Sequence, residues 1–149
     1  MRPPARLRLS LQIAAPGAEL PSRATLRRWA LCALERDAIV TLRFAGSREA
    51  RALNARFRGK DAPTNVLTFV YDERASLTGD IVICTAVVRR EAREQGKTFR
   101  AHLAHLIVHG MLHLQGYDHQ RPAEARCMER REVALLATLR IPDPYALPS

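Results

Sequence analysis

The stretch that decides the fold is His109–His119, which reads HGMLHLQGYDH. His109 and His113 are four residues apart, so on an α-helix, which has about 3.6 residues per turn, their imidazoles lie on one face. Gly116 follows the last apolar residue of the run by two positions, and glycine most easily adopts the left-handed conformation that ends a helix. The chain can then fold back, so that His119 joins the other two imidazoles. The spacing predicts a metal site with three histidine ligands.

The residues on the N-terminal side of this stretch predict a buried helix with one stripe of histidines. From Leu103 to Leu114, apolar side chains occupy every side of the helix except one, and a helix that is apolar nearly all round is buried. Burying neutral imidazoles without partners is costly, and a metal ion that takes one nitrogen from each is a direct way to satisfy them. The stripe consists of His102, His105, His109 and His113.

Only two of these four histidines can join His119 at one ion. His105 and His113 are separated by eight residues, roughly 12 Å along a helix axis, so they cannot bind the same ion. The pair is therefore His105/His109 or His109/His113. Only the second pair lies beside the turn that carries His119. We expect His102 and His105 to be hydrogen-bonded core residues or to support a metal ligand from outside.

The spacing of the three histidines also matches a zinc motif. His113 and His119 follow His109 by four and ten residues, as in the metalloprotease motif HExxHxxGxxH, and Gly116 takes the place of its glycine. That motif sets three imidazoles around zinc and leaves a fourth position open. Its Glu, the general base that activates the metal-bound water, is replaced here by Gly110. The sequence therefore predicts a metal site but argues against peptide hydrolysis by this route.

Three segments together resemble one protein family. HGMLHLQGYDH is similar to the signature H-G-x-L-H-L-x-G-Y-D-H of the YbeY family, bacterial ribosomal RNA maturation factors that are metal-dependent single-strand endoribonucleases. Residues 58–69, RGKDAPTNVLTF, resemble its R-x-K-D-x-P-T-[DN]-V-L-S-F segment, with Thr68 where Ser is usual. Residues 79–83, GDIVI, match its G-D-I strand start. The likeness covers most of the chain from about Leu53 to His119.

The resemblance implies a zinc-type hydrolase that acts on RNA phosphodiesters. It implies that His109, His113 and His119 hold one Zn²⁺ or another divalent ion, with His109 also a catalytic residue. It places Arg58 in the same cleft, where a guanidinium would stabilise the negative charge of the transition state. Without the resemblance, Arg58 would be interpreted as an exposed loop cation. We assign Arg58 and Lys60 to RNA binding, and the family's biology implies small-subunit ribosomal RNA maturation and ribosome quality control.

The sequence leaves the general base open. Asp118, which precedes His119, either orients an imidazole from outside the metal shell, accepts a proton, or bonds its own backbone as a turn residue. Asp80 and Asp61 are weaker candidates for the base. Alternatively, the 2′-hydroxyl of the RNA is the nucleophile, and the ion acts mainly as a Lewis acid.

Two other function classes compete with the nuclease. One is a ribosome-assembly factor that binds RNA and keeps a structural metal, although three ligands leave an open position whereas structural zinc sites generally close with a fourth. The other is a metallopeptidase with an unrecognised base, against which Gly110 argues.

Charge favours a nucleic-acid partner. The net charge is +9, from 24 Lys and Arg against 15 Asp and Glu, and neutralising phosphates releases condensed counterions. Because 22 of the 24 cations are Arg, biased base composition of the genome is an alternative explanation. The expected partners are single-stranded RNA, ribosomal RNA and the ribosome's small subunit.

Length and composition predict one domain that spans residues 1–149, with 142–149 as a loose tail. No run of 18 apolar residues and no signal peptide is present, so we expect a cytoplasmic protein with no membrane partner. Cys32, Cys84 and Cys127 are odd in number and widely spaced, which predicts reduced, partly buried thiols.

Hydrophobic periodicity predicts an α+β fold: a small mixed four-stranded sheet, about five helices, and the histidine helix at the centre. The last two strands should pair antiparallel. The predicted strands are residues 7–13, 38–45, 65–71 and 80–85, and the predicted helices are residues 23–36, 48–57, 86–95, 99–115 and 122–139.

Residue types at the helix ends predict where several helices begin. We expect Ser22, Ser47 and Thr98 to start helices, the first two as side-chain caps, and Pro122 to occupy the first turn of the last helix. The apolar face predicted for that helix consists of Cys127, Val133, Leu136 and Leu139.

Overall fold

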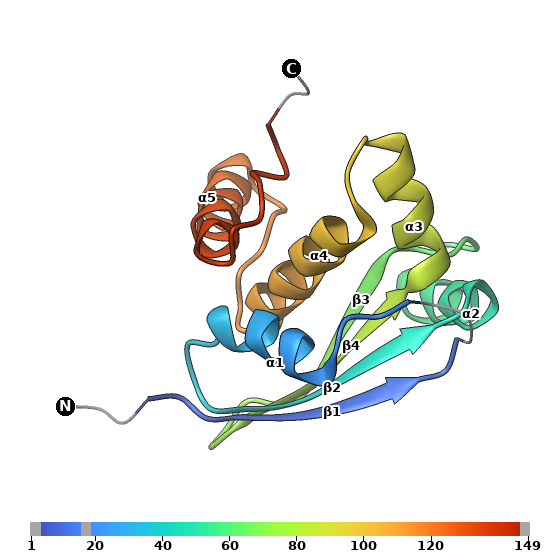
Figure 1. Cartoon of the computed structure of the whole chain (residues 1–149). Helices are drawn as coiled ribbons and strands as arrows, with labels where there is room; N and C mark the ends of the chain where they lie inside the picture. Colours follow the sequence, from blue (N-terminus) through green and yellow to red (C-terminus); the bar gives the residue numbers. More distant parts are fainter. Residues whose placement is uncertain (1–3, 16–18, 147–149) are drawn as a thin grey trace.

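The computed structural model describes residues 4–15 and 19–146, and within them it has four strands and five helices (Figure 1). The predicted α+β class and all nine predicted elements are confirmed. The elements are β1 (Leu7–Ile13), α1 (Arg23–Cys32), β2 (Ala38–Ala45), α2 (Ser47–Arg58), β3 (Val66–Asp72), β4 (Leu77–Cys84), α3 (Thr85–Glu94), α4 (Phe99–Leu114) and α5 (Pro122–Thr138).

The four strands form one mixed sheet in the order β1-β2-β4-β3. β1 pairs with β2 and β2 with β4 in parallel, whereas β3 and β4 pair antiparallel, as predicted. β3 is therefore an edge strand, and one side of its backbone is not covered by another strand of this sheet.

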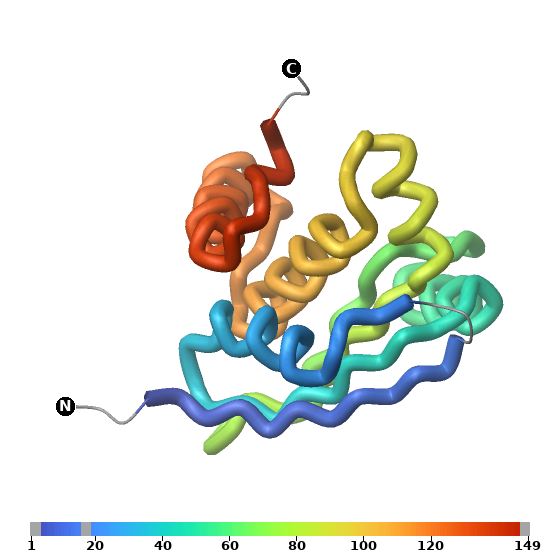
Figure 2. Tube along the Cα trace, in the orientation of Figure 1, coloured from blue at the N-terminus to red at the C-terminus, as the bar shows by residue number. Residues whose placement is uncertain are grey.

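Helices cover both faces of the sheet. α1 and α4 pack on one face, and α5 packs on α4 farther from the sheet (Figures 1 and 2). On the opposite face, α2 contributes Leu53 to a smaller cluster with Leu67 and Val82. α3 follows β4 and contacts both α2 and α4. This order of layers places α4 at the centre of the molecule.

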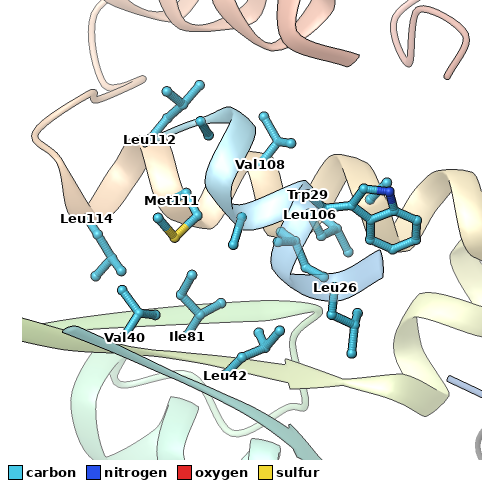
Figure 3. Packing of buried hydrophobic residues seen from close by; sticks show 14 of the residues in the cluster. Leu26, Trp29, Val40, Leu42, Ile81, Leu106, Val108, Met111, Leu112 and Leu114 are labelled. Carbon is cyan, nitrogen blue, oxygen red and sulfur yellow. The ribbon is translucent and has the colours of Figure 1, made fainter. Parts of the chain in front are cut away.

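The main core lies between α1, α4 and the sheet. Trp29 of α1 lies beside Leu106 of α4, and Met111 of α4 lies over Ile81 of the sheet (Figure 3). Eleven of the 16 residues of α4 are buried, which confirms the prediction of a buried helix. Burial of a side chain such as Leu or Met contributes about 1.5–3 kcal/mol, so α4 supplies a large share of the core's stability.

Several predicted helix ends are confirmed. The Ser22 side chain accepts a hydrogen bond from Thr25 N, Thr98 accepts one from Ala101 N, and Pro122 occupies the first turn of α5. The two hydroxyls satisfy backbone donors that have no partner within the first turn of a helix, and Pro122 has no N–H that would need one.

Two helix predictions were wrong at one end. The N-cap of α2 is Gly46 and not Ser47, which is the first helical residue. α1 ends at Cys32 and not at Arg36. The side chain of Gln115, which follows α4, donates to Ala33 O at 2.8 Å and accepts from Glu35 N at 2.6 Å. Because Gln115 forms hydrogen bonds with these backbone groups, they do not continue the hydrogen-bond pattern of α1, and the helix ends before Arg36.

The apolar face predicted for α5 was right in part, because Leu136 is buried and Leu139 packs against the main core. Cys127 is exposed, and the buried residues of α5 are Met128, Glu132, Leu135 and Leu136. These four residues recur at helical spacing on one face of α5, and one of them, Glu132, is a buried carboxylate. A pattern that counts only apolar residues leaves out Glu132 because it is charged, and so it does not identify the whole buried face of α5.

Glycines allow two close approaches at the centre of the fold. A Cβ on Gly110 would lie 3.1 Å from the side chain of Ile81, so the missing side chain lets α4 pack closely on β4. A Cβ on Gly79 would lie 2.5 Å from the carbonyl oxygen of Phe69. Gly79 thus permits the pairing of β4 with the edge strand.

We expect Gly79→Ala to lower the free energy of unfolding by about 1–3 kcal/mol, because the added methyl group meets a backbone oxygen that cannot rotate away. Gly46→Ala is the control without a clash, since nothing lies within 4 Å of a Cβ there; Ala is a poorer N-cap than Gly, so this variant should lose some stability but less than Gly79→Ala. Urea denaturation measures both, and equal stability of the two variants would contradict the packing argument.

Candidate metal and catalytic site

The three predicted metal ligands lie together. α4 presents His109 and His113, and the turn after α4 brings His119 beside them, with centroid distances of 6.1 Å for His109–His113, 5.7 Å for His109–His119 and 5.6 Å for His113–His119. Three imidazoles bound to one zinc at about 2.1 Å have ring centroids roughly 5–5.5 Å apart. The rings are thus arranged near the spacing that one ion requires.

The turn that brings His119 into place has the predicted conformation. Gly116 has φ +104°, and Tyr117 N donates to Leu112 O at 3.1 Å, so the chain reverses directly after α4. Asp118 accepts a hydrogen bond from His119 N at 2.7 Å and lies 3.9 Å from His119 Nδ1. Asp118 therefore shapes the turn, as a turn residue does.

Two of the imidazoles are fixed by hydrogen bonds at Nδ1. His109 Nδ1 lies 2.9 Å from Glu132 Oε2, and His113 Nδ1 lies 2.9 Å from the carbonyl oxygen of Tyr117. Both partners are acceptors, so each Nδ1 carries the proton and Nε2 of each ring is left with its lone pair. An imidazole held in this way is oriented for metal binding through Nε2.

Glu132 was missed by sequence reasoning. Only 1% of it is exposed, and its Oε1 lies 2.6 Å from His105 Nε2 and accepts from the hydroxyl of Tyr145 at 2.5 Å. His105, predicted to support a ligand from outside, thus contacts the same carboxylate that holds His109. One feature of the sequence could have indicated that Glu132 is buried: it lies four residues from Met128 and four from Leu136, both apolar residues of α5.

Tyr145 belongs to the predicted loose tail. Besides its bond to Glu132, the tail contacts the body where Lys97 Nζ donates to Pro144 O at 2.7 Å. The part of the tail that the structure describes is therefore attached, and residues 147–149 lie outside the described residues.

His102 is separate from this network. Its Nε2 lies 2.9 Å from Glu91 Oε1, and the residue is buried. Burial lowers the pKa of His102, although the hydrogen bond to Glu91 opposes the shift. This position is that of a hydrogen-bonded core histidine.

Two groups of side chains bring potential ligand atoms within 4.8 Å of one another. They are His105/His109/Glu132, a candidate metal site, and His113/Asp118/His119. The predicted ligands are divided between these two groups, which share one side of α4 and its following turn.

Burial affects the protonation of both groups. It lowers the pKa of His113, against the hydrogen bond to Tyr117 O, and so favours the neutral imidazole that a metal requires. Burial alone would raise the pKa of Glu132, but hydrogen bonds from His105, His109 and Tyr145 outweigh it and lower the pKa to about 2. Glu132 is therefore a carboxylate at neutral pH.

A cleft of about 510 Å³ joins the histidines to Arg58. Arg58 is the last residue of α2, and Gly59, with φ +70°, ends that helix and turns the chain toward β3. The cleft is lined by Phe57, Arg58, residues 65–71 and the three histidines 109, 113 and 119.

The remaining predicted site residues lie apart from this cleft. Asp61 pairs with Arg51 at 2.7 Å, and Asp80 accepts from the hydroxyl of Tyr71 at 2.7 Å. Neither carboxylate lines the cleft, nor does the exposed Lys60. The structure thus brings Arg58 to the histidines but no carboxylate from these two positions.

An α+β domain whose central helix, following turn and edge strand enclose a histidine cluster and an arginine belongs to the class of candidate metal-dependent enzymes. Comparison with known proteins identifies the group within this class. The family model described as Endoribonuclease YbeY matches residues 22–140. The chain therefore belongs to the YbeY family, which confirms the predicted family and, at that level, the predicted hydrolase.

Full-length relatives support this membership. The chain is 59% identical over 145 residues to the endoribonuclease YbeY of Aromatoleum aromaticum, covering 95% of this chain and 94% of the relative. It is 55% identical over 141 residues to that of Thiobacillus denitrificans, covering 93% and 96%. A solution structure of a Thermotoga maritima protein matches with a TM-score of 0.56 and 26% identity, covering 91% of this chain and 92% of the other.

A separate observation concerns membranes. Among residues 4–15 and 19–146, no helix combines the length and the apolar character needed to cross a bilayer.

The Glu132 network predicts a pH dependence of stability. Its folded pKa of about 2 lies below the ordinary 4.5, so the stabilisation is present above pH 4.5 and is lost as the pH falls toward 2. In protein stripped of divalent ions, this loss should amount to roughly 3 kcal/mol. Urea unfolding between pH 2 and 6 measures it.

Two variants test the origin of this slope. Glu132→Gln should have a shallower pH dependence over the same window, because the titrating carboxyl is gone. Tyr145→Phe removes one of the three hydrogen-bond donors to Glu132. The pH dependence of its unfolding free energy should therefore lie between those of Glu132→Gln and the wild type. Identical slopes in all three proteins would show that Glu132 does not carry the effect.

Proposed function

We propose that this protein is a divalent-metal-dependent endoribonuclease that cuts single-stranded RNA and acts in small-subunit ribosomal RNA maturation and ribosome quality control. The observation that carries the proposal is the single cleft that holds Arg58 together with His109, His113 and His119. The relatives' name, endoribonuclease, supports the reaction class.

His109, His113 and His119 are the proposed ligands of one ion, Zn²⁺ or another divalent cation. When bound, such an ion polarises a phosphate oxygen and lowers the pKa of a coordinated water. The chain's own contribution is orientation: Glu132 and Tyr117 O hold two of the rings by Nδ1. Three protein ligands leave a coordination position for substrate.

The group His105/His109/Glu132 is less suited to the catalytic ion. Its contacts of 2.6 and 2.9 Å are hydrogen-bond lengths, so an ion there would displace two shared protons and the hydroxyl of Tyr145. These residues serve better as the support of His109.

Arg58 is the proposed stabiliser of the transition state. It lines the cleft and makes no ion pair with a carboxylate of the described residues, so its guanidinium is available to the additional negative charge of the phosphorane-like state. The nucleophile would be the 2′-hydroxyl of the RNA or a water molecule in the cleft, whose activation an ion held by the three histidines would supply.

The structure argues against the metallopeptidase alternative at Gly110, the position where the metalloprotease motif has its general base. Gly110 faces Ile81 of the sheet, and a Cβ there would lie 3.1 Å from the Ile81 side chain, which is a crowded contact. A Glu at this position would therefore start against the core and not beside the histidines of the cleft.

The proposal extends to partners and location. The net charge of +9 suits ribosomal RNA and the small subunit, with Lys60 as an additional phosphate contact outside the cleft. We propose a cytoplasmic protein whose residues 1–149 form one domain.

The metal assignment predicts about one divalent ion per chain in the purified protein, measured by elemental analysis. His113→Ala should lose most of the ion because it removes a ligand. His102→Ala is the matched control: it removes an imidazole from the same helix at a position away from the other two ligands and should keep the ion. Equal metal content in the two variants would overturn the ligand assignment.

The catalytic assignment predicts that Arg58→Ala and His109→Ala lower single-turnover cleavage of single-stranded RNA by about two orders of magnitude or more, ~2.7 kcal/mol, with far less effect on RNA affinity. Arg51→Ala is the matched control, since it removes the same charge from the same helix outside the cleft.

Two outcomes would redirect the proposal. Equal losses of affinity and cleavage in Arg58→Ala would make Arg58 a phosphate anchor only. A correctly folded His109→Ala protein that cuts at the wild-type rate would place the activity outside this chain and favour the RNA-binding assembly factor.

A further inference from the structure

One exposed aromatic ring stands directly beside the proposed catalytic arginine. Phe57 is 55% exposed and lines the same cleft as Arg58 and the histidines. Single exposed apolar residues are common on protein surfaces and need no explanation. Phe57 differs because it opens onto a polar, cationic site for an anionic substrate.

The ring of Phe57 is fixed by its neighbours. Its centroid lies 5.1 Å from that of Phe69 at an interplanar angle of 69°, and the guanidinium carbon of Arg56 lies 5.3 Å from it. Phe69 in turn packs against the buried Leu67 and Val82. A ring held in place loses little conformational entropy when it binds a partner.

The edge strand connects this ring to the histidines. Side chains alternate along β3, so Val66 faces the α4 side with the main core whereas Leu67 and Phe69 face α2. Residues of both sets line the one cleft, because β3 has a strand neighbour on one side only. A polymer that crosses this open edge reaches the histidines on one side and Phe57 on the other, with Arg58 also lining its path.

The charges around the cleft distinguish its two ends. Phe57 lies between Arg56 and Arg58 in the chain, which suits a nucleotide whose phosphate meets a guanidinium. Tyr71, the other exposed aromatic ring of the cleft, is followed by Asp72 and Glu73, which repel phosphates. The arginine-flanked end is therefore the better place for a nucleotide.

We propose that Phe57 is a base-stacking subsite for the nucleotide next to the scissile phosphate of single-stranded RNA. The inference rests on the proposed function and deepens it. Stacking on an aromatic face accepts every base and so needs no particular sequence. It requires an unstacked base, which single strands offer and duplexes do not, so Phe57 contributes to the choice of single strands.

The test uses single-stranded RNA oligonucleotides, each with 2-aminopurine at one position, mixed rapidly with the metal-loaded protein so that binding is read before cleavage. Stacking quenches 2-aminopurine, so one position should lose fluorescence with wild-type protein. Phe57→Ala should abolish that quenching and weaken RNA affinity roughly 5- to 150-fold. Phe57→Trp should retain both, whereas Phe57→Leu, which keeps an apolar side chain without an aromatic face, should not.

Ile13→Ala is the matched control, because Ile13 is 64% exposed on the opposite edge strand; it should bind like the wild type. If wild-type protein binds and cuts RNA but no position is quenched, or if Phe57→Leu binds as tightly as the wild type, the stacking subsite is wrong while the nuclease stands. If folded, metal-loaded wild-type protein binds no RNA, the proposed function fails as well.

Discussion

The structure depends on one constraint: a helix that is buried on nearly every side also carries four histidines, and each must find a partner inside the fold. An unpartnered buried polar group costs free energy comparable to a lost hydrogen bond or more. α4 meets this constraint at one nitrogen of each ring with acceptors from three other segments, whereas Nδ1 of His102 and Nδ1 of His105 are buried without a partner among the described residues. Glu91 of α3 holds His102, Glu132 of α5 holds His105 and His109, and the carbonyl oxygen of Tyr117 holds His113.

These partners also order the site. Glu132 requires α5 to pack on the outer side of α4, and Tyr145 brings the C-terminal segment to the same carboxylate. The close approach of Gly110 to Ile81 fixes the other side of α4 on the sheet. α4 is thus fixed on both of its sides, and His109 and His113 are oriented through Nδ1. Nε2 of each ring is left for a ligand in the cleft.

Much of this arrangement was predictable from sequence because it is local. The spacing of His109, His113 and Gly116 determines which groups meet within one helix and one turn, and the alternation of the strands gave the sheet. Contacts that cross the fold were not predictable from periodicity. Glu132 joins α4 over 23 residues to His109, and its charge excluded it from an apolar pattern.

The same distinction applies to the ends of elements and to the cleft. Gln115 ends α1 from 82 residues away along the chain, which no local capping rule includes. Arg58 lies near the histidines only because the order of the strands places β3 at the edge of the sheet. Local sequence patterns do not determine that order, so only the resemblance to a family indicated that Arg58 belongs to the site. Phe57 became a candidate only when its exposure and its neighbours were known.

The central claim is that one ion binds to Nε2 of His109, His113 and His119, with Glu132 outside its coordination shell. Anomalous X-ray scattering from crystals of the zinc-loaded protein locates the ion directly. We expect a single peak about 2.0–2.1 Å from those three nitrogens, with Glu132 still hydrogen-bonded to Nδ1 of His109. A peak at bonding distance from Glu132, between His105 and His109, would contradict it.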